Sequence, residues 1–144
     1  MEAAFGEALR AAELGETPVG AVVVAPSGEI AGRGHNLVIA ASDPSAHAEI
    51  VAIRQACLAA GSERLHGYDL YVTLEPCTMC AAAISFARIR RLYFGASDEK
   101  GGAVDHGVRF FSSPTCHHAP EVYGGIGEAR SAALLRDFFR KLRA

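Results

Sequence analysis

Residues 69–80 read Asp-Leu-Tyr-Val-Thr-Leu-Glu-Pro-Cys-Thr-Met-Cys. The first six residues of this stretch alternate bulky β-formers and predict a strand. Pro76 cannot continue a strand's hydrogen-bond ladder but suits the first turn of a helix, which we expect to run to about Ala87. Cys77 and Cys80 are three residues apart and would share one face of that helix. The stretch therefore predicts a strand that leads directly into a helix whose first turn carries two thiols.

The rest of the chain predicts more helices and strands around this unit. We expect helices over Glu2–Leu14, from Asp43 to about Ala60 and over Glu128–Leu142, and strands over Val19–Ala25, Glu29–Asn36, Arg91–Ala96 and Glu121–Tyr123. Residues 97–120 predict mainly a loop, with a short helix near Val104–Phe110. An initial hairpin followed by alternating helices and strands indicates an α/β fold, a three-layer α/β/α sandwich around a mixed five-stranded sheet.

Composition limits the class of protein. With 144 residues and 15.1 kDa the chain has about the length of one domain, so we expect a single domain over residues 1–144. Half of the residues are hydrophobic and 21% are charged, which excludes intrinsic disorder. No apolar run approaches the roughly 18 residues that cross a bilayer, so we expect no membrane association. Residues 1–5 lack the basic flank and cleavage site of a secretory signal, which predicts a cytoplasmic protein.

Charge is distributed unevenly, although the net charge is only −2. Residues 1–16 hold four Glu and one Arg, a net of −3, whereas residues 136–144 hold three Arg, one Lys and one Asp, a net of +3. A basic end can contact phosphates even in an acidic chain. The alternative reading of this end is a solvated amphipathic helix.

The four cysteines are too few for a disulfide scaffold in a chain of this length. The close pair Cys77 and Cys80 is better explained by metal binding or by redox chemistry. At a helix start, free backbone amides and the helix dipole favour the thiolate that a metal requires. The pair is therefore a candidate for two ligands of one ion.

The segment His47-Ala48-Glu49, which we place in the first turn of another helix, completes the candidate site. One imidazole and two thiolates give a tetrahedral zinc ion three protein ligands and one open position, as in catalytic rather than structural sites. Glu49 need not point at the ion and can lie beside a water in that position. A carboxylate there can take a proton from the water and return it to a leaving group. The pattern is that of zinc deaminases, with one zinc ion per subunit.

Three other interpretations of these residues stay open at this point. A redox pair would use Cys77 and Cys80 alone and would leave His47 and Glu49 without a role. A structural zinc site would need a fourth ligand, for which the candidates are Cys57, Cys116, His117 and His118. A non-catalytic zinc module could bind RNA or support a partner deaminase, but it would have no use for the general base that Glu49 provides.

Several segments resemble the bacterial tRNA-specific adenosine deaminases of the cytidine-deaminase-like superfamily, in the same order and spacing. The matching segments are Pro18–Val22, Gly34-His35-Asn36, Asp43–Glu49, Leu70–Cys77, Phe94-Gly95-Ala96 with Asp98, and Asp137–Arg140. The resemblance covers nearly the whole chain. It implies a cytidine deaminase-like fold and a homodimer that deaminates adenosine to inosine at the wobble position of a tRNA anticodon loop.

The resemblance also assigns roles to individual residues. His47, Cys77 and Cys80 would bind zinc, and Glu49 would move protons. Asn36 would hydrogen-bond the flipped-out base, Asp98 would contact the ribose, and the backbone amides of Ala48 and Cys77 would help to hold the base and the water. Phosphate contacts that position the RNA would come from Arg136, Arg140, Lys141 and Arg143.

One segment departs from the family pattern. Where the family commonly has an Asn-His-Arg run before the last strand, this chain has His117-His118-Ala119. The change implies a different grip on the anticodon loop or a smaller substrate. Deamination of a free nucleobase or nucleoside, of the guanine, cytosine or adenosine type, is therefore the alternative function. His106, Phe110 and Phe111 are further candidates for lining the substrate channel, with ordinary packing as the alternative for the two phenylalanines.

Overall fold

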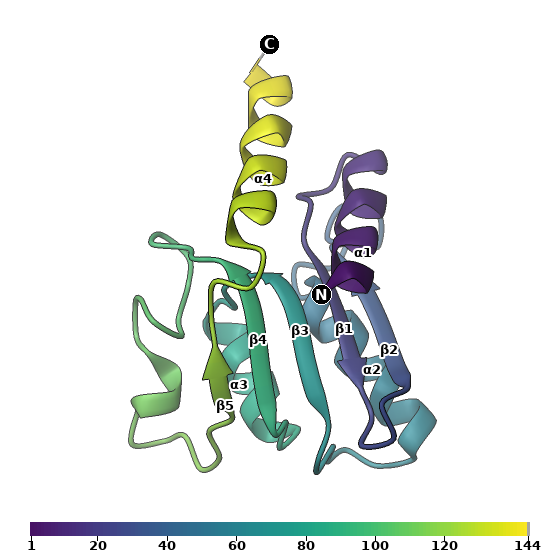
Figure 1. Cartoon of the computed structure of the whole chain (residues 1–144), viewed down its shortest axis with the longest axis vertical. Coiled ribbons are helices and arrows are strands. Elements are labelled where there is room, and N and C mark those ends of the chain that lie inside the picture. Colours follow the sequence, from purple (N-terminus) through teal and green to yellow (C-terminus); the bar gives the residue numbers. More distant parts are fainter. Residues whose placement is uncertain (144) are drawn as a thin grey trace.

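The computed structural model describes residues 1–143 and has the predicted α/β fold (Figure 1). The helices and strands are α1 (Glu2–Glu13), β1 (Gly20–Val24), β2 (Ile30–His35), α2 (Ala48–Ala60), β3 (Asp69–Leu74), α3 (Thr78–Phe86), β4 (Arg91–Ala96), β5 (Glu121–Tyr123) and α4 (Glu128–Arg143). None of the helices within residues 1–143 is both long and apolar enough to span a membrane.

The five strands form one mixed sheet in the order β2-β1-β3-β4-β5. β1 pairs antiparallel with both β2 and β3, whereas β3, β4 and β5 run parallel to one another. The carboxyl ends of the parallel strands meet at one edge of the sheet, which is where open α/β sheets bind ligands. The segments that follow β3 and β4 therefore emerge side by side.

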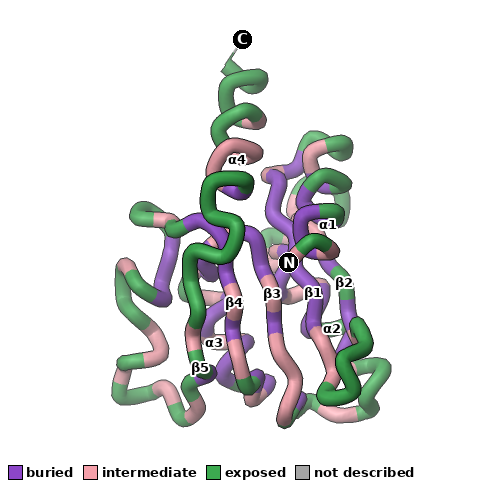
Figure 2. Tube along the Cα trace, in the orientation of Figure 1, coloured by how far each residue is buried: buried purple, intermediate pink, exposed green. Residues whose placement is uncertain are grey.

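Two helical layers cover the sheet, which confirms the α/β/α sandwich. Figure 1 shows α2 and α3 behind the sheet and α1 and α4 on the near side, with α4 extending beyond the strand ends. α2 lies very close to β2, since a Cβ added to Gly34 would be 2.4 Å from the Ala48 carbonyl oxygen. Figure 2 shows the buried residues concentrated in the central strands and the helix faces against them. The largest apolar side chains of this core are Phe94, Leu65, Leu70, Ile84, Ile89 and Leu92.

The expectation that a helix begins at Asp43 is wrong, because α2 begins at Ala48. The Asp43 carboxylate instead closes a turn, accepting hydrogen bonds from the Ser45 N–H (2.9 Å) and the Ser45 hydroxyl (2.7 Å). An Asp-Pro-Ser segment fits such a turn as well as a helix cap. The consequence is that His47 directly precedes the helix and has extended backbone angles.

The short helix expected near Val104–Phe110 is also wrong, since one turn of 3-10 helix occupies Phe110–Ser112 instead. The backbone N–H groups of residues 104–106 donate to the Glu75 carboxylate. The Phe110 N–H donates to the Ala103 carbonyl, seven residues earlier, and not to the carbonyl four residues earlier as in an α-helix. α3 likewise begins at Thr78, two residues later than expected, with Cys77 as its N-cap residue.

Candidate active site

Three metal-ligating side chains meet where α2 and α3 begin. The Nδ1 atom of His47 lies 3.6 Å from the Sγ atom of Cys77 and 3.6 Å from the Sγ atom of Cys80. All three candidate ligand atoms lie within 4.8 Å of one another. Residues 33 positions apart in the chain are thus brought together, as the sequence predicted.

The distances in this group fit a tetrahedral zinc ion. Zinc lies about 2.3 Å from a thiolate sulfur and about 2.0 Å from an imidazole nitrogen, so a shared ion would place the nitrogen about 3.5 Å from each sulfur. The observed separations of 3.6 Å match that value. Two thiols and one imidazole are also the chemical donor set that zinc prefers.

The candidates for a fourth ligand lie outside this group in the described part of the chain. The Cys116 Sγ contacts the Ser85 hydroxyl at 3.5 Å and donates to the His118 carbonyl at 3.1 Å. His118 directs Nε2 to the Ile89 carbonyl at 2.8 Å. Neither these residues nor Cys57 and His117 join the group around His47. The group therefore has three protein donors, which disfavours a closed structural site.

The two thiols differ in acidity. A hydrogen bond from the Cys80 thiol, together with the nearby His47, lowers the pKa of Cys77 to about 4. The same hydrogen bond, burial and the nearby Glu49 raise the pKa of Cys80. Because two adjacent thiolates repel each other, one of them keeps its proton until a cation compensates both charges.

Glu49 is the buried carboxyl group of the site. It lies in the first turn of α2 and is only 4% exposed. Burial, and to a lesser extent the charge on Cys77, raises the pKa of Glu49 to about 7. A carboxyl group with a pKa near neutrality can both accept and release a proton at physiological pH.

A cavity of about 290 Å3 joins Glu49 to the predicted substrate contacts. Its lining includes His47, Glu49 and Cys77, together with Asn36 and Asp98. This volume is close to the lower limit of about 300 Å3 for small-molecule sites, which suits one base or nucleoside.

The remaining candidates from the sequence are the Ala48 amide and three aromatic side chains. The Ala48 side chain is fully buried, but its N–H is in the first turn of α2 and has no carbonyl partner within the helix. His106, Phe110 and Phe111 are not among the residues that line the cavity. Phe111 packs against the hydrophobic core, as expected for ordinary packing.

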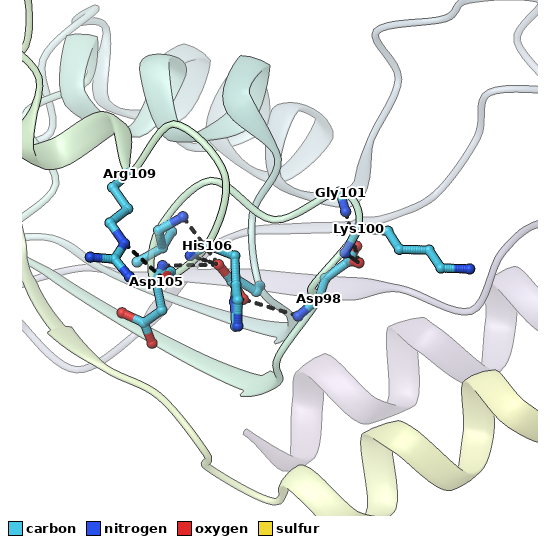
Figure 3. Close-up of polar contacts among 8 residues, drawn as sticks. Asp98, Lys100, Gly101, Asp105, His106 and Arg109 are labelled. Carbon is cyan, nitrogen blue, oxygen red and sulfur yellow. Dashed lines mark hydrogen bonds and ion pairs between the residues drawn. The ribbon is translucent and has the colours of Figure 1, made fainter.

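Sequence reasoning missed the role of Glu75 in this site. Its carboxylate accepts hydrogen bonds from the N–H groups of Asp98, Val104, Asp105 and His106 and also contacts the His106 ring. Burial alone would raise the pKa of Glu75, but these hydrogen bonds outweigh it and lower the pKa. Figure 3 shows how Asp98, Asp105 and His106 lie relative to one another in this hydrogen-bond network. The only sequence signal is a glutamate placed between a strand and Pro76.

Helix α4 contributes a second wall that the sequence did not predict. Leu135 and Phe139 line a hollow with Asp98 and Lys100, beside the main cavity. Phe138 and Phe139 line another with Asn36 and His47. The apolar side of α4 therefore borders the candidate site in addition to packing on the sheet.

Comparison with known proteins agrees with this geometry. Residues 1–96 match the family described as the cytidine and deoxycytidylate deaminase zinc-binding region. The chain is 63% identical to a tRNA-specific adenosine deaminase of Agrobacterium fabrum, over 99% of this chain and 93% of that protein. It belongs to the tRNA-specific adenosine deaminases. These are zinc-dependent hydrolytic deaminases. A homologue of the same name from Bacillus subtilis is 44% identical over 99% of this chain and 88% of that protein.

Solved structures agree with this family assignment. One described by studies of A-to-I editing by tRNA:A34 deaminases at the wobble position of transfer RNA superimposes with a TM-score of 0.92 and 63% identity. The match covers 94% of this chain and 97% of that chain. A guanine deaminase from Bacillus subtilis has a TM-score of 0.64 and 29% identity over 99% of this chain and 90% of that chain. The deaminases of tRNA and of a free base thus share this fold.

Proposed function

We propose that this chain is a zinc-dependent aminohydrolase that converts adenosine to inosine at the wobble position of tRNA. One observation carries the chemistry, namely a buried carboxyl group that shares a cavity with a His–Cys–Cys metal-ligand group. The choice of tRNA is supported by the similarity over nearly the full length to tRNA-specific adenosine deaminases. We further propose that residues 1–144 form a single deaminase domain.

In this proposal His47, Cys77 and Cys80 hold the zinc ion. When bound, zinc acts as a Lewis acid that makes water nucleophilic near neutral pH. Glu49 accepts a proton as the water oxygen adds to C6 of the adenine ring. Glu49 then delivers a proton to the departing amine, the C6–N bond breaks, and ammonia and inosine are the products.

The substrate contacts follow from the lining of the cavity. Asn36 comes directly after β2 and offers an amide donor and acceptor to the base edge. Asp98 comes after β4 and offers a carboxylate to a ribose hydroxyl. The free N–H of Ala48 at the start of α2 supplies a further donor beside the ligands. An unpaired anticodon base can enter such a cavity at low cost because it has no pairing partner to leave.

The basic end of the chain is the proposed phosphate-binding surface. Arg136, Arg140, Lys141 and Arg143 are all exposed on α4. Because α4 also borders the cavity, phosphates of the anticodon loop can contact these residues while the base occupies the site. Such contacts would position the RNA without reading its sequence.

We also propose a homodimer and a cytoplasmic location. Leu58 on α2 is 84% exposed and Phe86 on α3 is 68% exposed, and both belong to the helical layer behind the sheet. These exposed apolar side chains are candidates for the surface that another subunit would cover. The cytoplasmic location follows from the proposed substrate, since tRNA is an intracellular RNA.

The test is to incubate the purified protein separately with a tRNA that carries a wobble adenosine and with a panel of free bases and nucleosides. The proposal predicts inosine at the wobble position and no ammonia from the free compounds. Deamination of free compounds alone would support the alternative, which the guanine deaminase likeness and the His117-His118-Ala119 departure favour. A matched tRNA with guanosine at the wobble position is the control that shows whether any inosine comes from another position.

A further inference from the structure

We propose that Glu75 is a positioning residue for nucleotide binding, because its carboxylate holds the loop over residues 97–106 in the conformation that presents Asp98 to the cavity. The inference rests on the proposed function, since it concerns the affinity of that site for its nucleotide. Glu75 acts through Asp98 and does not itself perform the chemistry.

The position of Glu75 fits an organising role. It follows β3 directly, and its side chain is completely buried. Oε1 accepts a hydrogen bond from the Asp98 N–H (2.9 Å) and lies 2.8 Å from Nδ1 of His106. Oε2 accepts from the N–H groups of Val104 (3.1 Å), Asp105 (2.9 Å) and His106 (3.2 Å). One carboxylate thus satisfies both ends of the loop.

The contacts at Asp98 carry this order into the cavity. Its N–H is fixed by Glu75, and its Oδ1 atom accepts hydrogen bonds from the N–H groups of Lys100 (3.2 Å) and Gly101 (2.9 Å) (Figure 3). The Asp98 carbonyl accepts the Gly102 N–H at 2.9 Å. Hydrogen bonds thus hold both the backbone of Asp98 and one of its carboxylate oxygens. The other carboxylate oxygen therefore has a defined direction in which to accept a hydrogen bond from a substrate hydroxyl.

The loop is also packed closely around Glu75. A Cβ added to Gly102 would be 2.5 Å from both the Oε2 atom of Glu75 and the carbonyl oxygen of Asp98. The Ala103 N–H also donates to the carbonyl of Pro76, the residue that follows Glu75, at 2.9 Å. The loop cannot shift independently of this carboxylate, so a change in Glu75 is expected to move Asp98.

The test uses Glu75→Gln and His106→Gln, with Asp69→Asn as the matched control. Glu75→Gln replaces one acceptor oxygen with an NH2 group, which cannot accept hydrogen bonds from the backbone N–H groups that face it. His106→Gln leaves the four backbone hydrogen bonds to Glu75 in place. Asp69 begins β3, the strand that Glu75 follows, and its carboxylate accepts hydrogen bonds from the Arg90 guanidinium. All variants are made in the inactive Glu49→Ala protein, and the affinity for an anticodon stem-loop is measured by fluorescence anisotropy.

We expect the dissociation constant to rise about tenfold in Glu75→Gln, two- to fourfold in His106→Gln and not at all in Asp69→Asn. In the active protein KM should rise by similar factors, while kcat and zinc content stay near those of the unaltered protein. In an Asp98→Ala background, Glu75→Gln should have little additional effect, because both changes remove the same contact.

Two results would overturn the inference: effects of Glu75→Gln and Asp98→Ala that multiply independently, or a loss of kcat with unchanged affinity. Hydrogen exchange of the amides of residues 98 and 104–106 tests the loop without any substrate. Faster exchange in Glu75→Gln is expected, and unchanged exchange would contradict the structural basis even if the protein proves to act on another nucleotide. Failure of the unaltered protein to edit tRNA would refute only the proposed function.

Discussion

The two sides of the cavity are built in different ways. On one side, His47, Glu49 and Cys77 lie at the starts of two helices that pack against the sheet. On the other side, Asn36 and Asp98 lie in loops after strand ends. The contrast teaches that the groups proposed to break bonds are on packed elements, whereas those proposed to recognise the nucleotide depend on hydrogen bonds to loop backbone.

Buried carboxylates hold both loops of the recognition side. Glu16 is 1% exposed and accepts hydrogen bonds from the N–H groups of Ile39 and Ala40, just after Asn36. Glu75 does the same for the loop that carries Asp98. Hydrogen bonds from backbone N–H groups to a carboxylate are stronger than those between neutral groups, so each carboxylate can hold its irregular loop in place. We therefore expect substitutions on the recognition side to alter the affinity for the nucleotide, and substitutions on the helix side to alter the rate of turnover.

The largest effect is expected from a ligand on the helix side. Cys80→Ala removes one of the three donors, so the protein should lose its zinc and its deamination should fall to background. Zinc is measured by atomic emission and inosine by nuclease digestion and chromatography. Cys116→Ala, which removes a partly buried cysteine outside the ligand group, should retain both zinc and activity. Zinc retention and full activity in Cys80→Ala would contradict the ligand assignment.

Replacing the proposed proton carrier should slow the chemistry without removing the metal. Glu49→Ala is expected to lower kcat by about 10²–10⁴-fold, the usual contribution of a general acid–base group. Zinc content and RNA affinity should stay near those of the unaltered protein. Glu63→Ala, at an exposed glutamate after α2, is the control. Turnover in Glu49→Ala equal to that of the control would refute the proposed mechanism.

Removing the carboxylate on the recognition side should act mainly on binding. Asp98→Ala is expected to raise KM about tenfold, the cost of one hydrogen bond to a charged group, with kcat changed much less. Steady-state kinetics on an anticodon stem-loop separates the two parameters. A fall in kcat as large as that of Glu49→Ala would show that the two sides of the cavity are not functionally distinct.

The smallest effect concerns the pH dependence of the loop. The hydrogen bond to Glu75 raises the pKa of His106 above its ordinary value. A raised pKa in the folded state stabilises the protein fully below pH 6.5, and this contribution is lost as the pH rises through the folded-state pKa. His106→Gln should therefore lower the melting temperature more at pH 5.5 than at pH 9. An equal fall in melting temperature at both pH values would mean that the His106–Glu75 contact does not depend on the charge of His106.

The helix side was more predictable from the sequence than the recognition side. Cys77 and Cys80 signal their role by local spacing, and the alternation in 69–74 is a local β signal. The start of α2 was misplaced because Asp43 and Ser45 form a turn that uses the same residue types as a helix cap. The role of Glu75 was missed because its partners lie 23–31 positions further along the chain. Such non-local hydrogen bonds leave no periodic pattern in a sequence.

The most direct test of a catalytic zinc site is the X-ray absorption spectrum of the zinc-loaded protein at the zinc edge. We expect two sulfur ligands, one imidazole nitrogen and one light atom from solvent, because His47, Cys77 and Cys80 leave one position open. A third sulfur or a second imidazole in the zinc shell would mean that the protein closes the site. That result would contradict a catalytic role for the metal beside Glu49.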